Sequence, residues 1–308
     1  MRRINRCAAA LVAAVSLLAL SPSPAAAKRL VFNSLSSSNI YSIDLDGSNL
    51  QTLFSTGDDQ STSLAYDPVT TKIFWGVDIP SNYIVKANLD GSGRQTFPLD
   101  DGPDSMALDH GLGKLYYGSE DGSTLHRMNL DGTGLQTIVF DPTNYAFGIA
   151  IDAAGGKVYW TLAGNKYIDR ANLDGTQQED LILGPGPDPA FTFGATYGIA
   201  LDVPNGKMYF SDEDDSYYYR ANLDGTGIER FTPEDMMHPH GIALDLDAGR
   251  IYWAQQGAIG SSDLDGGRVV HYPVDGFPHS LVIVPEPTTW ALACGGLAAL
   301  IVVRRRRR

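Results

Sequence analysis

Six residues occupy the same position in a repeated pattern, and their side chains are of the kinds that bind ligands. Each stands directly before a short apolar segment such as "GIALD" at 241–245. The six are Thr62, Asp104, Phe147, Tyr197, His240 and His279. Because equivalent positions of a repeat lie on one face, we expect these residues to form a ring of aromatic and titratable groups, which is typical of a binding site.

Two members of this ring are histidines in successive repeats. His240 and His279 could share a metal ion through their imidazole nitrogens. Two ligands do not make a metal site, however, since zinc sites use three or four protein ligands. The alternative is that each histidine caps or packs at the entry of a strand, and the sequence leaves no firm metal site.

An acidic run, "SDEDDS" at 211–216, is the best candidate for calcium. It contains Asp212, Glu213, Asp214 and Asp215. Carboxylate oxygens are the ligands that calcium prefers, and their density here is high. The alternative is a solvated loop between two strands. Calcium is the only cofactor for which the sequence offers residues.

Six Asp-Gly pairs recur every 41 to 50 residues. They are Asp46-Gly47, Asp90-Gly91, Asp131-Gly132, Asp174-Gly175, Asp224-Gly225 and Asp265-Gly266. In "NLDGTGIER" the glycine stands two residues too early for an EF-hand calcium loop, and the segment lies between apolar strands rather than helices. We therefore predict hairpin turns at these pairs, of type I′ with both residues at positive φ.

The repeat also contains two kinds of strand. Apolar segments lie at 63–67, 105–109, 148–152, 198–202, 241–245 and 280–284. Aromatic segments such as "KVYWT" lie at 72–76, 114–118, 157–161, 207–211 and 250–254, and a sixth, "RLVFN", lies at 29–33. Short segments rich in β-branched and aromatic residues, bounded by turn residues, are typical of strands. Six all-β units of about 43 residues predict a six-bladed β-propeller with four-stranded antiparallel blades.

The two ends of the repeat region predict how the ring closes. "SLVIV" at 280–284 has no aromatic partner after it, and "RLVFN" at 29–33 has no apolar partner before it. An open ring would expose sheet edges and apolar faces. We therefore expect the N-terminal strand to pair with the last strand and complete the sixth blade.

These elements resemble the six-bladed YWTD propeller of the low-density lipoprotein receptor group, over about residues 29–284. The resemblance places the "GIALD" strand innermost, the YWTD strand second and the "NLDG" strand third. Tyr159, Trp160 and Thr161 match the first three YWTD positions, and "YFSD" at 209–212 keeps the final aspartate. Val77, Ser119, Leu162 and Gln255 replace that aspartate in the other repeats, so we do not expect its contacts between blades there.

The N-terminus has the pattern of a secretory signal peptide. Arg2, Arg3 and Arg6 precede the apolar run 7–20, and an Ala-x-Ala pattern ends at Ala27. Such a segment is removed during export. We predict a signal peptide over 1–27, cut after Ala27, and a propeller over 28–284.

The C-terminus, 285–308, resembles the PEP-CTERM sorting signal of Gram-negative bacteria. Pro285, Glu286 and Pro287 form the motif, an apolar run of 14 residues follows at 290–303, and the cluster Arg304, Arg305, Arg306, Arg307 and Arg308 ends the chain. The apolar run would make a short transmembrane helix of about 21 Å, with the arginines cytoplasmic. The resemblance implies an inner-membrane intermediate that an exosortase-type enzyme cuts near the motif.

Charge limits the partners of the exported body. Without the eight arginines of its two ends, the chain has 15 basic residues against 36 acidic ones, a net charge of −21. We therefore expect no nucleic-acid partner. Cys7 and Cys294 both lie in the terminal segments, so the propeller has no disulfide.

No catalytic motif of a common hydrolase, zinc enzyme or nucleotide-binding enzyme occurs in the sequence. We predict a non-catalytic propeller, displayed on the cell surface or in the extracellular matrix, that binds a protein or a polysaccharide. Two alternatives remain, a metal-dependent lactonase or lyase of the propeller type and a binding protein that stays anchored in the periplasm.

Overall fold

The structure is a computed structural model, which describes residues 27–286, apart from 58, 80, 120–123, 141–145, 163–165, 184–195, 214–215 and 232–236. Lys28–Glu286 forms one compact unit. The predicted signal peptide before Ala27, the motif residue Pro287, the apolar run and the terminal arginines lie outside the described residues. No helix in the described part of the chain is long and apolar enough to cross a membrane.

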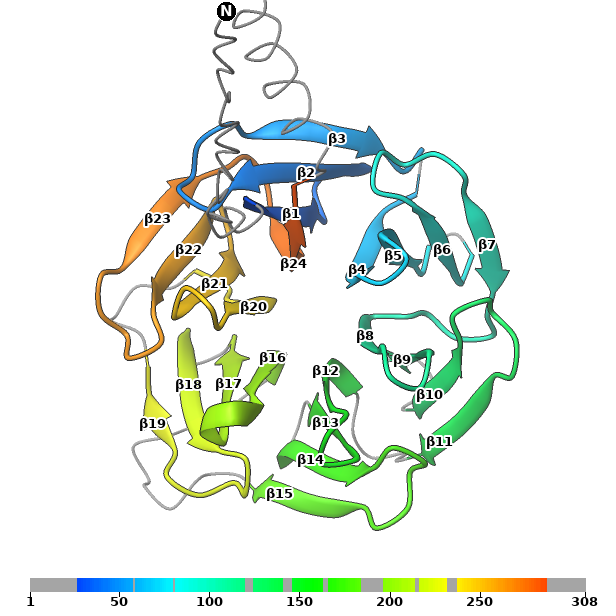
Figure 1. The fold of residues 1–308 in the computed structure, drawn as a ribbon, viewed down its shortest axis with the longest axis vertical. Coiled ribbons are helices and arrows are strands. Elements are labelled where there is room, and N and C mark those ends of the chain that lie inside the picture. The colour runs from blue at the N-terminus through cyan, green and yellow to red at the C-terminus, as the bar shows by residue number, and fades with distance from the viewer. Residues whose placement is uncertain are drawn as a thin grey trace, which may run out of the picture. The chain divides into compact units, whose positions relative to one another are not determined.

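The described strands form six four-stranded antiparallel sheets arranged as the blades of a propeller (Figure 1). The first two complete blades in chain order are β4(Ser61–Asp67), β5(Lys72–Val77), β6(Tyr83–Asn88), β7(Gln95–Pro98) and β8(Ser105–Asp109), β9(Lys114–Ser119), β10(Thr124–Asn129), β11(Gln136–Phe140). The next three are β12(Ala146–Asp152), β13(Lys157–Leu162), β14(Lys166–Asn172), β15(Glu179–Leu183); β16(Thr196–Asp202), β17(Lys207–Asp212), β18(Tyr217–Asn222), β19(Glu229–Arg230); and β20(Ile242–Asp245), β21(Arg250–Gln255), β22(Ala258–Asp263), β23(Val270–Pro273). The predicted six-bladed, all-β architecture is confirmed.

The last blade joins the two ends of the body. It has the order β24-β1-β2-β3, with strands β1(Lys28–Ser34), β2(Asn39–Asp44), β3(Gln51–Ser55) and β24(Pro278–Pro285). β1 and β24 are antiparallel, with Leu30 opposite Ile283 and Phe32 opposite Leu281. Figure 1 shows this pair as the dark blue and orange-red strands. The predicted closure is therefore confirmed.

The aromatic second strands supply the core between blades. Trp75, Trp160 and Trp253 are at most 1% exposed. One hydrophobic cluster joins Tyr159 of β13 to Met208 of β17, and thus spans two neighbouring blades. Since burial of a large side chain contributes about 1.5–3 kcal/mol, these contacts stabilise the ring rather than each blade alone.

The Asp-Gly pairs do form turns, but the predicted turn type is wrong. Between β2 and β3, Gly47 N donates to Asp44 O at 2.9 Å, and Asp44 N donates to Ser48 O at 2.9 Å, so the loop contains three residues. Gly47 has φ +84°, whereas Asp46 keeps a negative φ. This is a type I turn followed by a left-handed glycine. Asp46 Oδ1 accepts hydrogen bonds from Ser48 N and Oγ, so its carboxylate stabilises the turn.

Hydroxyl groups at the third YWTD position connect neighbouring blades. Thr161 Oγ1 accepts a hydrogen bond from Gly148 N at 2.7 Å and donates to Tyr197 O of the next blade at 2.8 Å. Ser211 makes the same pair of contacts, to Gly198 N and His240 O. These hydroxyls bridge one inner strand to the next, which ties the entries of β12, β16 and β20 together.

Candidate functional site

The innermost strands β4, β8, β12, β16, β20 and β24 surround a cavity of about 250 Å³ at the centre of the propeller. Five of the six predicted ring residues line it, namely Asp104, Phe147, Tyr197, His240 and His279. These five residues form one end of the cavity, and we call this end the channel mouth. The sixth, Thr62, lies beside them, because its carbonyl oxygen is 2.7 Å from His279 Nδ1.

Glycine at the start of the "GIALD" segments allows the inner strands to approach closely. A Cβ atom at Gly148 would lie 1.9 Å from Tyr197 O, and one at Gly198 would lie 2.1 Å from His240 O. No side chain fits at either position. The glycines therefore bring the residues that precede them, one in each blade, into contact at the channel mouth.

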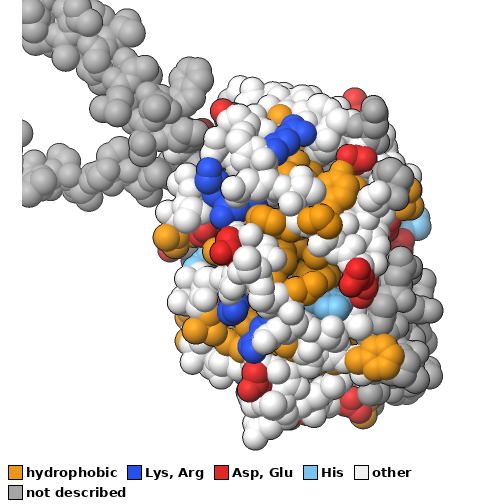
Figure 2. Space-filling model, turned by 90° about the vertical axis from the view of Figure 1, so that its right-hand side faces the viewer, with side chains coloured by type: hydrophobic (Ala, Val, Ile, Leu, Met, Phe, Trp, Pro, Cys, Tyr) orange, Lys and Arg blue, Asp and Glu red, His pale blue; other side chains and the backbone are white. Residues whose placement is uncertain are grey.

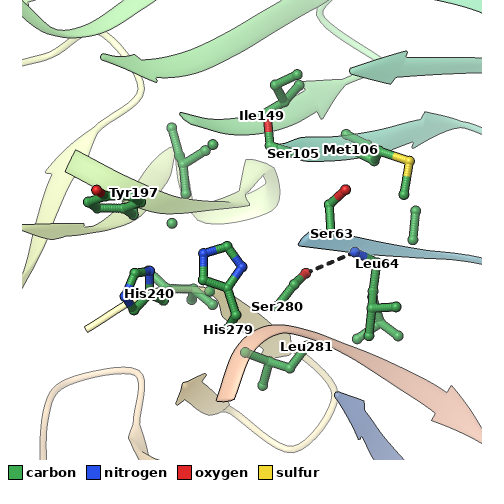
Figure 3. A pocket seen from close by; sticks show the side chains of 18 of the residues that line it. Ser63, Leu64, Ser105, Met106, Ile149, Tyr197, His240, His279, Ser280 and Leu281 are labelled. Atoms are coloured by element: carbon green, nitrogen blue, oxygen red, sulfur yellow. Dashed lines mark hydrogen bonds between the residues drawn. The ribbon is translucent and has the colours of Figure 1, made fainter. Parts of the chain in front are cut away.

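Ring contacts run from blade to blade around the channel mouth. The ring centroids of Phe147 and Tyr197 are 4.4 Å apart, those of Tyr197 and His240 4.8 Å apart, and those of His240 and His279 4.6 Å apart. Figure 3 shows the rings of His240 and His279 beside one another, with Tyr197 of β16 near His240. Four blades thus contribute to one continuous aromatic surface.

The imidazole of His240 is buried and has no hydrogen-bond partner in the part of the chain that the structure describes. The residue is only 4% exposed, and neither Nδ1 nor Nε2 makes a hydrogen bond to any of the described residues. His126 gives the contrast. It is 6% exposed, yet Nε2 contacts Thr124 Oγ1 and Asp101 Oδ2, and Nδ1 contacts Thr137 Oγ1. Buried polar groups are normally paired, so the imidazole of His240 stands out as a group without a structural role for its nitrogens.

Both mouth histidines are neutral at pH 7. Burial, together with the neighbouring His279 and His238, lowers the pKa of His240 to about 2. Burial also lowers the pKa of His279, against the opposing effect of its hydrogen bond to Thr62. Because a carbonyl oxygen only accepts, His279 Nδ1 carries the proton and Nε2 keeps a lone pair.

Three further residues, which do not occupy the repeated position before the inner strands, reach the channel mouth. They are Phe277, His238 and Glu213. Phe277 lies 5.0 Å from His240 between ring centroids. His238 contacts Glu213, with Nδ1 2.7 Å from Oε1, and Glu213 Oε1 is 3.9 Å from His240 Nε2. A repeated triplet could have identified two of them, because "HPH" at 238–240 and "FPH" at 277–279 place an aromatic ring two residues before each histidine.

The two metal hypotheses stay predictions. No group of three or more His, Cys, Asp or Glu side chains at metal-binding spacing occurs in the described ranges. Of the calcium candidates, Asp212 ends β17 and is fully buried, and Glu213 contacts His238. Asp214 and Asp215 lie outside the described residues.

The channel mouth presents no positive charge from the residues that define it. Among the described residues that line the cavity there is no lysine or arginine, whereas Asp104 is present. The outer surface differs: Figure 2 shows one side of the body, on which basic and acidic side chains are interspersed around a hydrophobic area. The mouth is therefore suited to neutral groups more than to anions.

Comparison with known proteins identifies the C-terminal segment. Residues 284–308 match the PEP-CTERM protein-sorting motif. This match indicates an exported protein that an exosortase-type sorting system processes. Part of the propeller is 33% identical to Protein cueball of Drosophila yakuba over 108 residues, which is 33% of this chain and 17% of that protein. The relative from Drosophila grimshawi is 29% identical over 128 residues, 37% of this chain and 20% of that protein.

Solved structures share the fold at low sequence identity. The propeller resembles a chain in the crystal structure of a nidogen/laminin complex, with a TM-score of 0.73 and 18% identity over 83% of this chain and 98% of that one. It also resembles virginiamycin B lyase from Staphylococcus aureus, with a TM-score of 0.59 and 18% identity over 82% of this chain and 86% of that one. The chain is thus a six-bladed propeller that resembles the nidogen YWTD propeller and ends in a PEP-CTERM sorting motif.

Proposed function

We propose that this protein is sorted through its C-terminal motif to the cell surface or extracellular matrix of a Gram-negative bacterium. There the propeller acts as a non-catalytic module that binds a protein or a glycan at the channel mouth. The C-terminal helix holds the chain in the inner membrane until an exosortase-type enzyme cuts near Pro285, Glu286 and Pro287.

One observation carries this proposal: His279 and Pro285 lie at opposite ends of strand β24. His279 belongs to the channel mouth, and Pro285 begins the sorting motif. Six steps of extended chain place them about 20 Å apart. The sorting motif therefore begins at the end of β24 opposite the channel mouth.

The side chains at the channel mouth favour binding over catalysis. A metal-dependent lactonase or lyase needs three or more convergent ligands, and the described residues gather no such group. What they offer is an aromatic surface and a buried imidazole with unused hydrogen-bonding capacity. The similar propeller in the nidogen/laminin complex supports a binding role, because it occurs in a complex of two proteins.

The test is the intact mass of the protein recovered from separate fractions of its native host. We expect a species that begins at Lys28, ends near the motif and lies outside the inner membrane. A double variant, Pro285→Ala with Pro287→Ala, should retain the tail and accumulate in the inner membrane. Thr288→Ala with Thr289→Ala, which leaves the motif intact, serves as the matched control. A wild-type protein that keeps its whole tail in the inner membrane contradicts the proposal and favours an anchored periplasmic binding protein.

A further inference from the structure

The unpaired imidazole of His240 defines what the channel mouth can recognise. A neutral imidazole offers one N–H donor and one nitrogen acceptor, whichever tautomer it adopts. Both nitrogens are buried and unpartnered among the described residues, and the residue lines the cavity. Leaving a buried polar group without a hydrogen bond is unfavourable. A ligand that both donates and accepts hydrogen bonds would satisfy this side chain.

A second acceptor lies next to it. His279 Nδ1 donates to the carbonyl of Thr62, which fixes the tautomer and leaves Nε2 as a lone-pair acceptor. The ring centroids of the two histidines are 4.6 Å apart, so groups spaced like neighbouring hydroxyls on one ligand can reach both. Figure 3 shows both imidazoles projecting between the inner strands.

Charge around these groups disfavours an anionic ligand. Asp104 lines the cavity, and Glu213 Oε1 lies 3.9 Å from His240 Nε2. Both histidines are neutral at pH 7, and the cavity lining within the described residues contains no lysine or arginine. A carboxylate or phosphate would thus lie near two acidic side chains, and the described cavity lining offers no lysine or arginine to bind it.

The size and the aromatic surface indicate the class of ligand. Phe147 and Tyr197 stack on one another at the cavity wall, and Tyr197 continues to His240. The cavity of about 250 Å³ lies just below the usual range of small-molecule pockets, about 300–1,000 Å³. It is large enough for one ring-sized group and too small for a folded segment of another protein.

We infer that the channel mouth binds one neutral sugar residue of a glycan, with His240 and His279 hydrogen-bonded to its hydroxyls and the Phe147–Tyr197 pair contacting its apolar face. A hydroxyl donates and accepts, which matches the imidazole, and it carries no charge for Asp104 to repel. This inference rests on the proposed binding function and narrows it to neutral glycans.

The test measures binding of the full-length chain, kept in detergent, to an array of four ligand classes. These are neutral hexose oligosaccharides, uronic acid oligosaccharides, amino-sugar oligosaccharides and basic peptides. We expect binding to neutral oligosaccharides, followed by calorimetry with the best of them. His240→Phe keeps an aromatic ring but removes both nitrogens, and should weaken binding about 10- to 100-fold. His240→Gln keeps one donor and one acceptor and should retain part of the affinity. His271→Phe, on the exposed strand β23, is the matched control and should bind as the wild type does.

The melting temperature of His240→Phe distinguishes a ligand-binding role of His240 from a structural one. Because the nitrogens of His240 make no hydrogen bonds within the described protein, His240→Phe should melt at the same temperature as the wild type or higher. A lower melting temperature together with unchanged binding would overturn the inference. So would binding confined to uronic acids or basic peptides, or no neutral glycan bound at millimolar concentration. Those outcomes leave the sorting experiment unaffected, so a failure of the sugar assignment is distinguishable from a failure of the proposed function.

Discussion

Lys28 and Pro285 are paired residues in the ladder between β1 and β24. Lys28 is the first residue after the predicted signal-peptide cut, and Pro285 is the first residue of the sorting motif. Both predicted cuts therefore lie at the same end of the blade β24-β1-β2-β3. Leu281 and Val284, just before the motif, are at most 4% exposed. A cut that removed them would open the ring, so we expect sorting to leave β24 intact.

Truncation tests this dependence on β24. A chain that ends after Glu286 should melt like the complete body, because every strand is present. A chain that ends after Ser280 loses the burial of Leu281 and Val284, worth about 1.5–3 kcal/mol each, and most of the β1–β24 ladder. We expect it to be unfolded or aggregated at 25 °C, measured by circular dichroism. Cooperative melting of the shorter chain near the temperature of the longer one would contradict the closure argument.

Asn33 is expected to be a main stabilising residue of the closing blade. Its Oδ1 accepts a hydrogen bond from Ser280 N at 2.7 Å, its Nδ2 donates to Ser61 O, and the residue is fully buried. Asn33→Ala leaves both main-chain groups unsatisfied, so we expect a loss of about 2–5 kcal/mol in the free energy of unfolding. Urea denaturation measures it. Asn82→Ala removes one surface hydrogen bond, to Asp100 O, and should cost less than about 1 kcal/mol.

The hydroxyl of Thr161 should stabilise the propeller through its hydrogen bonds rather than through the volume that it fills. Thr161→Val keeps the volume but removes a buried hydrogen bond from Gly148 N and a partly buried one to Tyr197 O. We expect a loss of about 2–3 kcal/mol in unfolding free energy, whereas Thr161→Ser should lose less because the hydroxyl remains. Equal losses for the two variants, in matched urea titrations, would show that packing of the methyl group contributes as much as the hydroxyl bridge and would contradict this prediction.

The stability of the propeller should fall as the pH is lowered below about 6.5. The pKa of His240 is about 2 in the folded chain and about 6.5 when unfolded, so in this range only the unfolded chain takes up a proton. One such histidine changes the unfolding free energy by up to about 1.4 kcal/mol per pH unit, and His279, whose pKa is also lowered, acts in the same direction. His240→Phe should flatten this dependence between about pH 5 and 6.5, measured by denaturation at several pH values.

Carboxylates act in a lower pH window. Burial opposes the shift at Asp67, but hydrogen bonds from Thr70 and Val69 leave its pKa below the usual value of 3.8. The stability that it contributes is present above that value and is lost as the pH falls further. A variant of His240 should therefore still lose stability below about pH 4. If His240→Phe showed the same slope as the wild type near pH 6, the imidazole would not be neutral in the folded chain.

Local features of the sequence predicted most of the fold. Alternating apolar segments, Asp-Gly turns and the unmatched ends at 29–33 and 280–284 are each visible within a few residues, and their repetition gives the number of blades. Alignment of the repeats also placed five residues at one cavity. The turn type at Asp46-Gly47 was predicted wrongly, because an Asp-Gly pair fits both a two-residue and a three-residue loop. The register of the flanking strands selects between them.

The sequence by itself determined the repeat, the closing pair of strands and the sorting motif, because each depends on residues that are neighbours in the chain or recur at a fixed spacing. Only the tertiary structure decided that the imidazole of His240 has no hydrogen-bond partner among the described residues, while that of His126 contacts Asp101, Thr124 and Thr137. It also brought Glu213 and Phe277 to His240. Those relationships follow from how the blades pack around the centre, and close packing joins residues that are far apart in the sequence.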